Sequence, residues 1–508
     1  MKNVVLVILD GWGYGQSWGG NAITIADTTN YDRILRKFPN TLISASGTAV
    51  GLPGHEVGNS EVGHMNIGAG QIVWQDISII NKSITDGSFY KNEALLSSIE
   101  NSKKNSTTIH LMGIVSDGGI HSHIVHLMAL LKLCNKIGHK DVLIHAFTDG
   151  RDTNPMEGIE FINTIIKTCE KLQTGKIATI SGRGFLDRKG NWTQTQKIYN
   201  AIADGIGTKE KNALSAMSNA YKQGETDEFI KPRIIEGISS KVKDSDTIIF
   251  FNFRSDRTRQ LTTAFLDRNF DKFPRRKIEG INFVSFIPYG VEQELEVNSK
   301  SAFNSAEVAH TIGQFYSQNN LRQFHLAETE KFAHVTYFIN GNRKDPYHLE
   351  DRILVPSPDV QSYDLKPEMS AEEVKNTLVK HIKRKEHPLI ICNFANGDMV
   401  GHTGVFTAAV KAVEVLDKIV KEVTDACFET ETPLIITADH GNIEQMVDPQ
   451  TGQPYTEHTN NPVPFIVISS DNDLKLKKSG KLANISSTIL DLAGIEKPEY
   501  FDESLIIR

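Results

Sequence analysis

The sequence predicts an α/β protein built from two domains, and three observations support this. The chain has 508 residues, whereas single hydrophobic cores rarely grow beyond about 250–300 residues. Short apolar runs rich in β-branched residues alternate with helical patterns, as in buried parallel sheets. Each run ends in a turn that carries Asp, Arg or His. Because ligands of open parallel sheets bind beyond the carboxyl ends of the strands, these turns are the candidate functional positions.

The predicted strands fall into two chemical groups. They span residues 4–9, 109–115, 142–147, 248–253, 389–394 and 434–437. The turns near the two chain ends supply Asp, His and Ser, whereas the turns in the middle of the chain supply mostly Arg. The simplest layout is therefore one domain formed by both chain ends, with a second domain inserted between them.

Composition and charge argue against several classes of protein. Hydrophobic residues make up 39% of the chain and charged residues 23%, as in soluble globular proteins. The net charge of −7 is spread along the chain, so we expect no nucleic acid or membrane partner. Asp10 cuts the first apolar run short of a signal-peptide core, and no segment approaches the roughly 18 apolar residues of a membrane span. Four scattered cysteines without a C-x-x-C pair predict a reducing, cytoplasmic location and no thiolate zinc site.

One group of side chains has the composition of a metal site. Its members follow predicted strands or lie in loops: Asp10, Asp398 and His402 in "ANGDMVGHTG", Asp439 and His440 in "TADHGN", and His458 in "TEHTNNPVP". Singly, each has an ordinary explanation as a turn or hydrogen-bonded residue; together they favour ligation. Histidines with carboxylates and no thiolates suit manganese, with zinc, magnesium or iron as alternatives. The group is large enough for two ions, a common clamp in phosphoryl chemistry.

Ser60 lies in the glycine-rich stretch "PGHEVGNSEVGHMNIGAG". The sequence around it is not the G-x-S-x-G turn of α/β-hydrolases. A serine bound to a divalent metal needs no histidine base, because the metal lowers the pKa of its hydroxyl. We therefore expect Ser60 to be a metal-activated nucleophile, with His55 and His64 in supporting roles.

A second group is basic and lies in the middle of the chain. It contains Arg151, Asp152, Arg183, Arg188, Arg254 and Arg257. Planar guanidinium groups hold phosphate and carboxylate through two bonds at once. His121 and His123 are either a further metal pair or an acid–base or phosphate-binding site in a turn. Neither a G-x-G-x-x-G nor a Walker motif is present, so we expect no nucleotide.

Nine motifs in order across nearly the whole chain resemble the 2,3-bisphosphoglycerate-independent phosphoglycerate mutases of the alkaline phosphatase superfamily. They are "VILDGWG", "GNSEVGHMNIGAG", "SDGGIHSH", "TDGRDT", "FNFRSDRTRQ", "AETEKFAHVTYFINGN", "NGDMVGHTG", "TADHGN" and "EHTNNPVPF". The resemblance implies an alkaline-phosphatase-like metal domain, residues 1–76 and 310–508, with an inserted phosphotransferase domain, residues 77–309.

The resemblance also implies roles for the site residues. Ser60 becomes phosphoserine. One Mn²⁺ is held by Asp10, Ser60, Asp439 and His440, and the other by Asp398, His402 and His458. The phosphoglycerate is surrounded by His121, Arg151, Asp152, Arg183, Arg188, Arg254, Arg257 and Lys331. The sequence departs from the family after Arg183, where "SGRGFLDRKGNW" is one residue shorter and lacks a later arginine before Trp192.

The implied activity is an isomerase of glycolysis and gluconeogenesis that interconverts 3- and 2-phosphoglycerate without bisphosphoglycerate. Metal-held Ser60 attacks the phosphate, Lys331 offsets charge, Arg254 and Arg257 hold the carboxylate, and Asp152 is the base for the accepting hydroxyl. We expect a monomer. One alternative is another enzyme of the superfamily, such as a phosphatase, sulfatase or phosphopentomutase; another is a metal-stabilised binding protein for phosphorylated metabolites.

Overall fold

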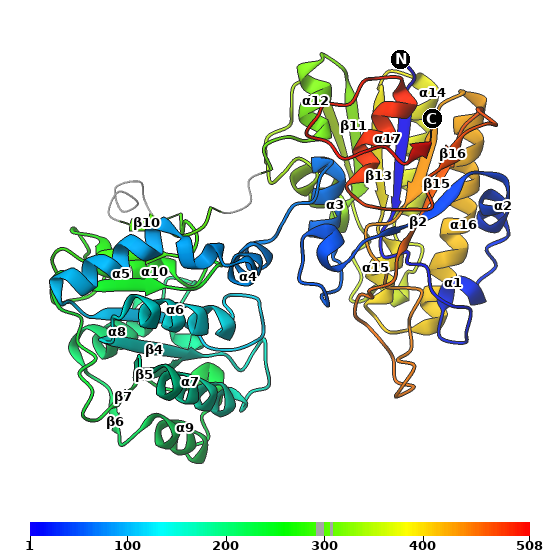
Figure 1. Ribbon diagram of the computed structural model, residues 1–508. Helices are drawn as coiled ribbons and strands as arrows, with labels where there is room; N and C mark the ends of the chain where they lie inside the picture. Colours follow the sequence, from blue (N-terminus) through cyan, green and yellow to red (C-terminus); the bar gives the residue numbers. More distant parts are fainter. Residues whose placement is uncertain (291–298, 305–307, 508) are drawn as a thin grey trace. The chain divides into compact units, whose positions relative to one another are not determined.

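The computed structural model describes residues 1–290, 299–304 and 308–507 of the chain. It divides into two compact units (Figure 1). Unit 1 contains Met1–Trp74 and Ala306–Arg508, and unit 2 contains Gln75–Ser305. The sequence places the corresponding boundaries after residues 76 and 309. Each unit is an α/β structure around its own sheet, so the predicted fold class is confirmed.

Within the described residues, unit 1 forms an eight-stranded sheet in the order β12-β11-β13-β1-β14-β15-β2-β17. The strands are β1 (Val4–Leu9), β2 (Asn40–Ser44), β11 (Gln323–Glu328), β12 (Glu350–Val355), β13 (Leu389–Phe394), β14 (Leu434–Thr437), β15 (Val463–Ile468) and β17 (Ser479–Lys481). β1 pairs in parallel with β13 and with β14. All six residues of β1 are buried, because helices cover both faces of the sheet.

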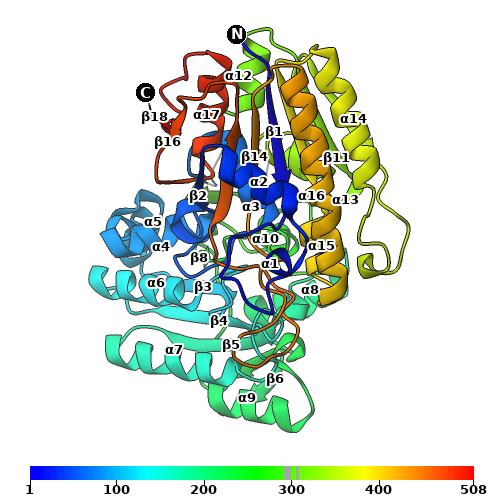
Figure 2. The same ribbon diagram turned by 90° about the vertical axis from the view of Figure 1, so that its right-hand side faces the viewer.

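The helices of unit 1 lie on the two sides of this sheet (Figure 2). The principal ones are α2 (Thr29–Lys37), α3 (Ser60–Ala69), α12 (Ile312–Gln318), α14 (Ala371–Arg384), α16 (Phe406–Glu429) and α17 (Asn484–Ala493). α16 packs against α14 and α2, whereas α3 packs against α17 and α12. Buried residues of α16 recur every three or four positions, at Ala409, Val413, Leu416, Val420 and Val423. This spacing turns one apolar stripe towards the core.

Unit 2 forms a second eight-stranded sheet in the part of the chain that is described, in the order β10-β9-β8-β3-β4-β5-β7-β6. Its strands are β3 (Ile109–Ile114), β4 (Val142–Thr148), β5 (Lys176–Gly182), β6 (Thr208–Glu210), β7 (Arg233–Ile235), β8 (Thr247–Phe250), β9 (Asn282–Ser285) and β10 (Ser299–Ser301). Its principal helices are α4 (Asp76–Asp86), α5 (Glu93–Asn105), α6 (Ile124–Ile137), α7 (Gly158–Leu172), α8 (Trp192–Tyr199), α9 (Ala213–Lys222) and α10 (Arg259–Leu266). β8, β3, β4 and β5 are parallel neighbours.

The six predicted strands are all present. Three have the predicted bounds, residues 4–9, 389–394 and 434–437, and two others differ by one residue at the carboxyl end. The last, predicted over residues 248–253, ends at Phe250. After it the Asn252 side chain accepts a hydrogen bond from the backbone N–H of Ile114, and Phe253 bonds the carbonyl of His121. Residues 251–253 therefore no longer belong to the strand, and Phe253 binds the turn that contains His121.

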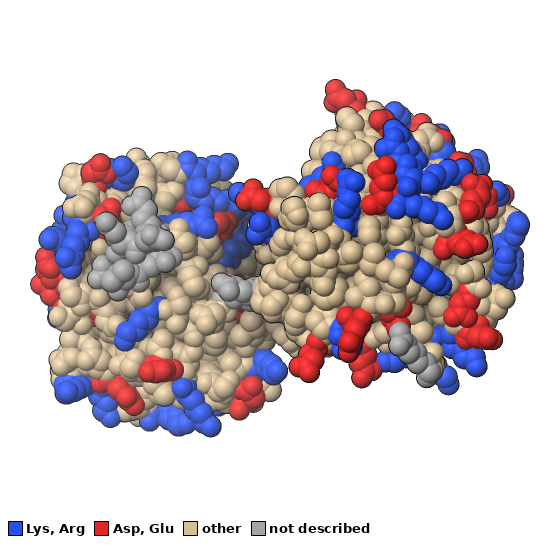
Figure 3. Space-filling model, turned by 90° about the horizontal axis from the view of Figure 1, so that it is seen from above, with Lys and Arg blue, Asp and Glu red and all other residues tan. Residues whose placement is uncertain are grey.

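Charged side chains of both signs are mixed on the part of the surface that Figure 3 draws. On the face drawn in Figure 3, Lys and Arg side chains lie among Asp and Glu side chains on both units. Among the described helices, none combines the length and apolar character needed to cross a membrane.

Candidate metal centre and arginine cluster

Three buried carboxylates meet at one edge of the sheet in unit 1. Asp10 follows β1, Asp398 lies in α15 (Asn396–Gly401) after β13, and Asp439 follows β14. All three side chains are buried. Because β13, β1 and β14 are adjacent and parallel, their carboxyl ends meet at the same edge. The sheet order thus gathers residues that are hundreds of positions apart in the sequence.

Asp398 forms one ligand group with two histidines. Its Oδ1 lies 3.1 Å from Nε2 of His402 and 3.0 Å from Nε2 of His458. Nδ1 of His402 lies 2.7 Å from the backbone carbonyl oxygen of Thr456, and Nδ1 of His458 lies 2.8 Å from that of Gly58. Each Nδ1 donates to its carbonyl, and the two Nε2 atoms lie 3.0 Å apart beside the same carboxylate. Two ring nitrogens gathered at one carboxylate fit the donor set of a cation site.

Ser60 is the first residue of α3, and its side chain faces Asp10 and His440. The side chain of Asn59 caps this helix by accepting from the N–H of Val62. The Oγ of Ser60 donates to Oδ1 of Asp10 at 3.1 Å and lies 2.9 Å from Nε2 of His440. The hydroxyl is thus at a helix N-terminus, where negative charge is favoured.

Asp439 supplies an acceptor without a hydrogen bond. Its Oδ1 accepts from the N–H groups of Gly11, at 3.3 Å, and His440, at 3.1 Å. Its Oδ2 is buried and forms no hydrogen bond within the described residues. Buried carboxylate oxygens are normally satisfied, so the residues present fit a bound cation here.

Three overlapping groups of potential ligands can be defined in the described part of the chain. In each, the ligand atoms lie within 4.8 Å of one another: Asp398, His402 and His458; Asp10, Asp398 and His440; and Asp10, His64 and Asp439. The predicted metal ligands other than Ser60 all belong to these groups, and the one additional member is His64.

Lys331 lies between the carboxylates of Asp10 and Asp398. It comes from α13 (Thr329–Ala333), which follows β11 directly. Its Nζ is 2.8 Å from Oδ1 of Asp10, 2.6 Å from Oδ2 of Asp398 and 2.8 Å from Oγ of Ser60. Burial alone would lower the pKa of Lys331, but these carboxylates outweigh it and raise the pKa above its usual value. The lysine is therefore a cation in direct contact with the serine.

The carboxylates also set the charge of the nearby histidine. Burial alone would lower the pKa of His440, but Asp439, Asp10 and Asp398 raise it to about 9. For Asp398, burial opposes ionisation, but Lys331 and the neighbouring histidines hold its pKa well below its usual value. The centre therefore concentrates negative charge that positive groups must balance.

The basic residues of unit 2 gather around three carboxylates, of which the first two are Asp152 and Asp149. Arg183, whose side chain is 2% exposed, pairs through Nη1 with Asp152 and, at 2.5 Å, with Oδ1 of Asp149. Burial alone would lower the pKa of Arg183, but these two carboxylates raise it. Oδ2 of Asp152 also lies 3.9 Å from Nε2 of His121.

The third carboxylate is Asp256, which the sequence analysis missed. It lies 3.2 Å from Nδ1 of His121, 2.8 Å from Nη1 of Arg188 and 3.6 Å from Nε of Arg254. Burial would raise the pKa of Asp256, but the hydrogen bonds from His121 and Arg188 bring it below its usual value. Despite the shorter loop after Arg183, Arg188 thus joins the cluster.

Two of the predicted arginines, Arg257 and Arg151, form no ion pair with Asp152 or Asp256 within the described residues. Nη1 of buried Arg257 donates to the backbone carbonyls of Arg183, at 3.3 Å, and Leu186, at 3.2 Å. Arg151 is 56% exposed and lies 3.6 Å from Glu228. Arg257 therefore braces the loop that carries Arg183, and Arg151 lies at the margin of the cluster.

His123 does not form a metal pair with His121. Its Nδ1 accepts from the N–H of Val125 and caps α6. No group of potential ligands within the described residues contains either histidine. The acid–base or phosphate-binding role of His121 in a turn stays a prediction.

The comparisons with known proteins agree with this site. Residues 2–497 match the Metalloenzyme superfamily. The chain is 48% identical over 514 residues to the 2,3-bisphosphoglycerate-independent phosphoglycerate mutase 1 of Methanosarcina barkeri, covering 100% of this chain and 98% of the relative. It is 48% identical over 511 residues to the enzyme of the same name from Clostridium kluyveri, covering 100% and 99%. The chain belongs to the 2,3-bisphosphoglycerate-independent phosphoglycerate mutases.

A solved structure of the phosphoglycerate mutases is similar too. The Leishmania mexicana phosphoglycerate mutase, crystallised at low cobalt concentration, is 30% identical and aligns over 100% of this chain and 98% of its own, with a TM-score of 0.65. The family predicted from nine motifs is therefore confirmed. Membership of a metalloenzyme family, together with the ligand groups, supports divalent metal binding.

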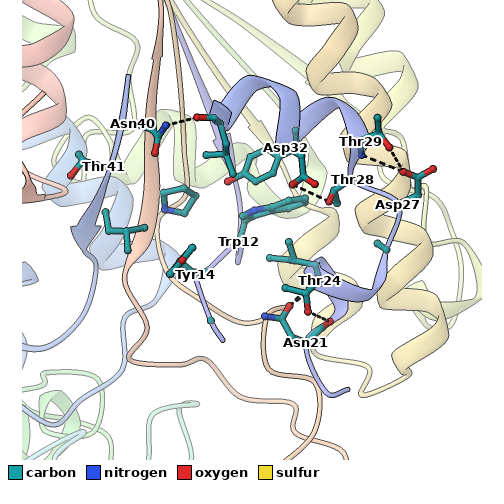
Figure 4. A pocket seen from close by; sticks show the side chains of 18 residues that line it. Trp12, Tyr14, Asn21, Thr24, Asp27, Thr28, Thr29, Asp32, Asn40 and Thr41 are labelled. Carbon is teal, nitrogen blue, oxygen red and sulfur yellow. Dashed lines mark hydrogen bonds between the residues drawn. The ribbon is translucent and has the colours of Figure 1, made fainter. Parts of the chain in front are cut away.

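A hollow of about 700 Å³ lies on unit 1 outside both clusters. Side chains from α1 (Ala22–Ile25), α2 and β2 line it together with Trp12, as Figure 4 shows. None of the predicted site residues is among those that line it. The chemistry of this mutase family member therefore has to be sought at the carboxylates and arginines.

Proposed function

We propose that this chain interconverts 3-phosphoglycerate and 2-phosphoglycerate through a phosphoserine on Ser60, without 2,3-bisphosphoglycerate. The observation that carries the proposal is the environment of one hydroxyl. The Oγ of Ser60 lies 2.8 Å from Nζ of Lys331, 2.9 Å from Nε2 of His440 and 3.1 Å from Oδ1 of Asp10. A serine in such surroundings is held as a nucleophile.

The proposal includes two divalent cations, with manganese the expected metal. Asp10, Ser60, Asp439 and His440 would hold one, and Asp398, His402 and His458 the other. Oxygen and nitrogen donors without thiolates suit manganese. Bound there, the cations supply positive charge that lowers the pKa of the serine hydroxyl and offsets charge on the transferred phosphoryl group.

The serine of unit 1 carries the phosphoryl group between the two steps, and the lysine beside it offsets charge. As the bond from Ser60 Oγ to phosphorus forms, the bond from phosphorus to the glycerate oxygen breaks. The serine hydroxyl loses its proton in this step and the leaving oxygen gains one, so that the protons balance. Lys331 contacts Ser60 Oγ and offsets the charge that accumulates during transfer. The second step runs in the opposite sense, with the other glycerate hydroxyl as the attacking group.

The arginine cluster of unit 2 would hold the glycerate between the two steps. Arg254 and Arg188 are partly exposed and can pair with a carboxylate or phosphate. Arg183 and His121 orient the Asp152 carboxylate, which would take the proton of the accepting hydroxyl. Keeping the glycerate bound separates a mutase from a phosphatase.

The proposed surroundings of the enzyme are simple. The four cysteines are all free and buried, as expected for a reducing compartment, and we place the enzyme in the cytoplasm. Its partner is the small phosphoglycerate itself, and we propose that it acts as a monomer.

The test measures isomerisation and phosphate release together, with manganese present and bisphosphoglycerate omitted. We expect 2-phosphoglycerate to form from 3-phosphoglycerate with little free phosphate. Ser60→Ala should abolish turnover and remove the phosphoryl group detectable on the protein by mass spectrometry. Free phosphate as the main product would favour a phosphatase of the same superfamily. Dependence on bisphosphoglycerate would refute the phosphoserine route.

A reconstitution experiment tests the metals. The chelated protein should regain mutase activity when manganese, cobalt, magnesium or zinc is returned separately, with manganese the most effective. Titration should reach two equivalents per chain. Full activity of the chelated protein would contradict the proposed role of the cations.

A further inference from the structure

His64 is a fully buried histidine one helical turn after the proposed nucleophile. It lies on α3 four residues beyond Ser60, so the two side chains occupy one side of the helix. Its Nδ1 is 2.9 Å from the backbone carbonyl oxygen of Ser60 and 3.2 Å from Oδ2 of Asp439. One ring nitrogen therefore faces both the nucleophile's own backbone and a carboxylate of the metal centre.

The other ring nitrogen of His64 faces Asn393 of β13. The buried Nδ2 of Asn393 donates to Oδ2 of Asp10 at 2.8 Å and lies 3.1 Å from Nε2 of His64. Asp10 fixes the orientation of this amide, since a rotated amide would set its oxygen against the carboxylate. Nε2 of His64 must then accept, so the proton of the neutral ring is on Nδ1 and is donated to the Ser60 carbonyl.

These contacts distinguish two roles for His64. Its Nδ1 lies within ligand range of Asp10 and Asp439, which would suit a third metal ligand. However, both ring nitrogens are already engaged, Nδ1 as a donor and Nε2 as an acceptor. The geometry therefore favours a role through other residues.

We propose that His64 and Asn393 form a positioning pair that fixes the Ser60 end of α3 against Asp10 and Asp439. The pair touches the backbone of the nucleophile and the side chains of two proposed metal ligands, yet contributes no ligand itself. It holds Ser60 Oγ at its distance from Asp10 and Lys331. The inference rests on the proposed function, since positioning matters only if Ser60 is the nucleophile.

The first test replaces His64. His64→Leu removes both ring contacts, whereas His64→Asn keeps an N–H donor near the position of Nδ1. We expect His64→Leu to lower kcat by about 10- to 100-fold with little change in KM for 3-phosphoglycerate, because the glycerate is held by unit 2. His64→Asn should recover most of the loss. Met65→Leu, a conservative change at the next position of α3, is the matched control.

The second test uses Asn393 and the metal. Asn393→Ala should resemble His64→Leu, and the double variant should lose little more than either, because the two residues act as one unit. Manganese titrated by electron paramagnetic resonance should still reach two equivalents in every variant, with weaker affinity.

Two results would overturn the proposed positioning role of His64. Loss of one manganese equivalent in His64→Leu and His64→Asn alike would make His64 a ligand and overturn the proposal. An unchanged kcat per folded molecule, with only a lower melting temperature, would also overturn it. If His64→Leu does not fold, His64→Asn and Asn393→Ala still decide. An inactive wild type that binds two manganese ions would instead refute the proposed function.

Discussion

The ammonium group of Lys331 lies 2.8 Å from the hydroxyl oxygen of Ser60, although 271 positions separate the two residues in the sequence. It also contacts Asp10 and Asp398, one carboxylate from each proposed ligand group. The lysine thus joins the nucleophile to both halves of the centre. Without a metal it balances the buried carboxylates together with His440, so its removal has separable effects on stability and on turnover.

Replacing this lysine should destabilise the metal-free protein more than the metal-loaded one. Removal of one partner from a buried ion pair costs about 3–5 kcal/mol, and we expect a loss of that order for Lys331→Met in the presence of chelator. Added manganese should reduce the difference, because it supplies positive charge to the same carboxylates. Urea unfolding with and without manganese measures both values.

The control for this variant is Lys411→Met. Lys411 is 60% exposed and lies 3.6 Å from Glu368, and such surface pairs contribute about 0–1 kcal/mol. Equal stabilities of Lys331→Met and the control without metal would show that the buried carboxylates do not depend on the lysine. Mutase activity of Lys331→Met should be lost even with manganese bound.

Gly54 and Gly68, which lie before and after Ser60 in the glycine-rich stretch, should differ sharply in their tolerance of alanine. A Cβ on Gly68 would lie 1.8 Å from the carbonyl oxygen of Ile339, a backbone atom that cannot rotate away, whereas a Cβ on Gly54 meets nothing within 4 Å. We expect Gly68→Ala to cost about 1–3 kcal/mol or more by overpacking and Gly54→Ala to stay within about 0.5 kcal/mol of the wild type. Thermal unfolding of both variants checks this, and equal melting temperatures would contradict it.

The strands and the acidic residues that follow them could be predicted because each rests on local sequence. Apolar runs such as residues 389–394 mark buried strands, and a polar residue directly after such a run lies at the sheet edge. Ser60 was indicated by its glycine-rich stretch, whereas Lys331 came from a family motif, since no spacing rule would single it out. The sequence could also relate His64 to Ser60, since four residues make one helical turn.

The partners of these residues could not be predicted, because they depend on sheet order and on side-chain direction. Asn393 reaches His64 only because β13 lies beside β1. Arg254 and Arg257 share one motif, yet the first is exposed and the second braces backbone carbonyls. Spacing alone does not tell which of two arginines faces solvent. Asp256, between them, contacts both His121 and Arg188, yet its position in the motif does not reveal these partners.

Glu444 should prove essential to the shape of the metal centre without touching a metal ligand's side chain. Its buried carboxylate accepts from the N–H groups of Gly13, at 3.1 Å, and Asn442, at 2.8 Å, and from the side chains of Asn461, at 2.9 Å, and Thr459. These donors belong to the segments that follow Asp10, His440 and His458. One side chain therefore ties three ligand-bearing loops together.

Glu444→Gln should cost about 1–3 kcal/mol, because the amide nitrogen of glutamine faces donors and leaves at least one of them unsatisfied. Manganese affinity should fall with it, as the loops loosen. Calorimetric titration and urea unfolding measure the two effects. Glu499→Gln, at an exposed position of the same unit, should change neither. A Glu444→Gln variant with wild-type stability would mean that the loops are fixed by other contacts.

A buried histidine of unit 2 should make the protein less stable in mild acid. His126 donates from Nε2 to Oδ1 of Asn81, and burial lowers its pKa to about 3. In the unfolded chain the ring takes up a proton near the ordinary histidine pKa of 6.5. The folded pKa is the lower one, so the unfolded state binds more protons below about pH 6.5, and stability is lost as the pH falls. The slope for one such group is about 1.4 kcal/mol per pH unit.

His126→Gln keeps an N–H donor towards Asn81 but cannot take up the proton. Its free energy of unfolding should therefore fall less steeply than that of the wild type between about pH 6.5 and pH 5, by the slope of one group. Urea unfolding at several pH values measures this difference. The matched control, Asn101→Gln, changes an exposed residue of the same unit that carries no titratable group, and it should leave the slope unaltered. Parallel curves for His126→Gln and the wild type would show that the ring takes up its proton in the folded state as readily as in the unfolded chain.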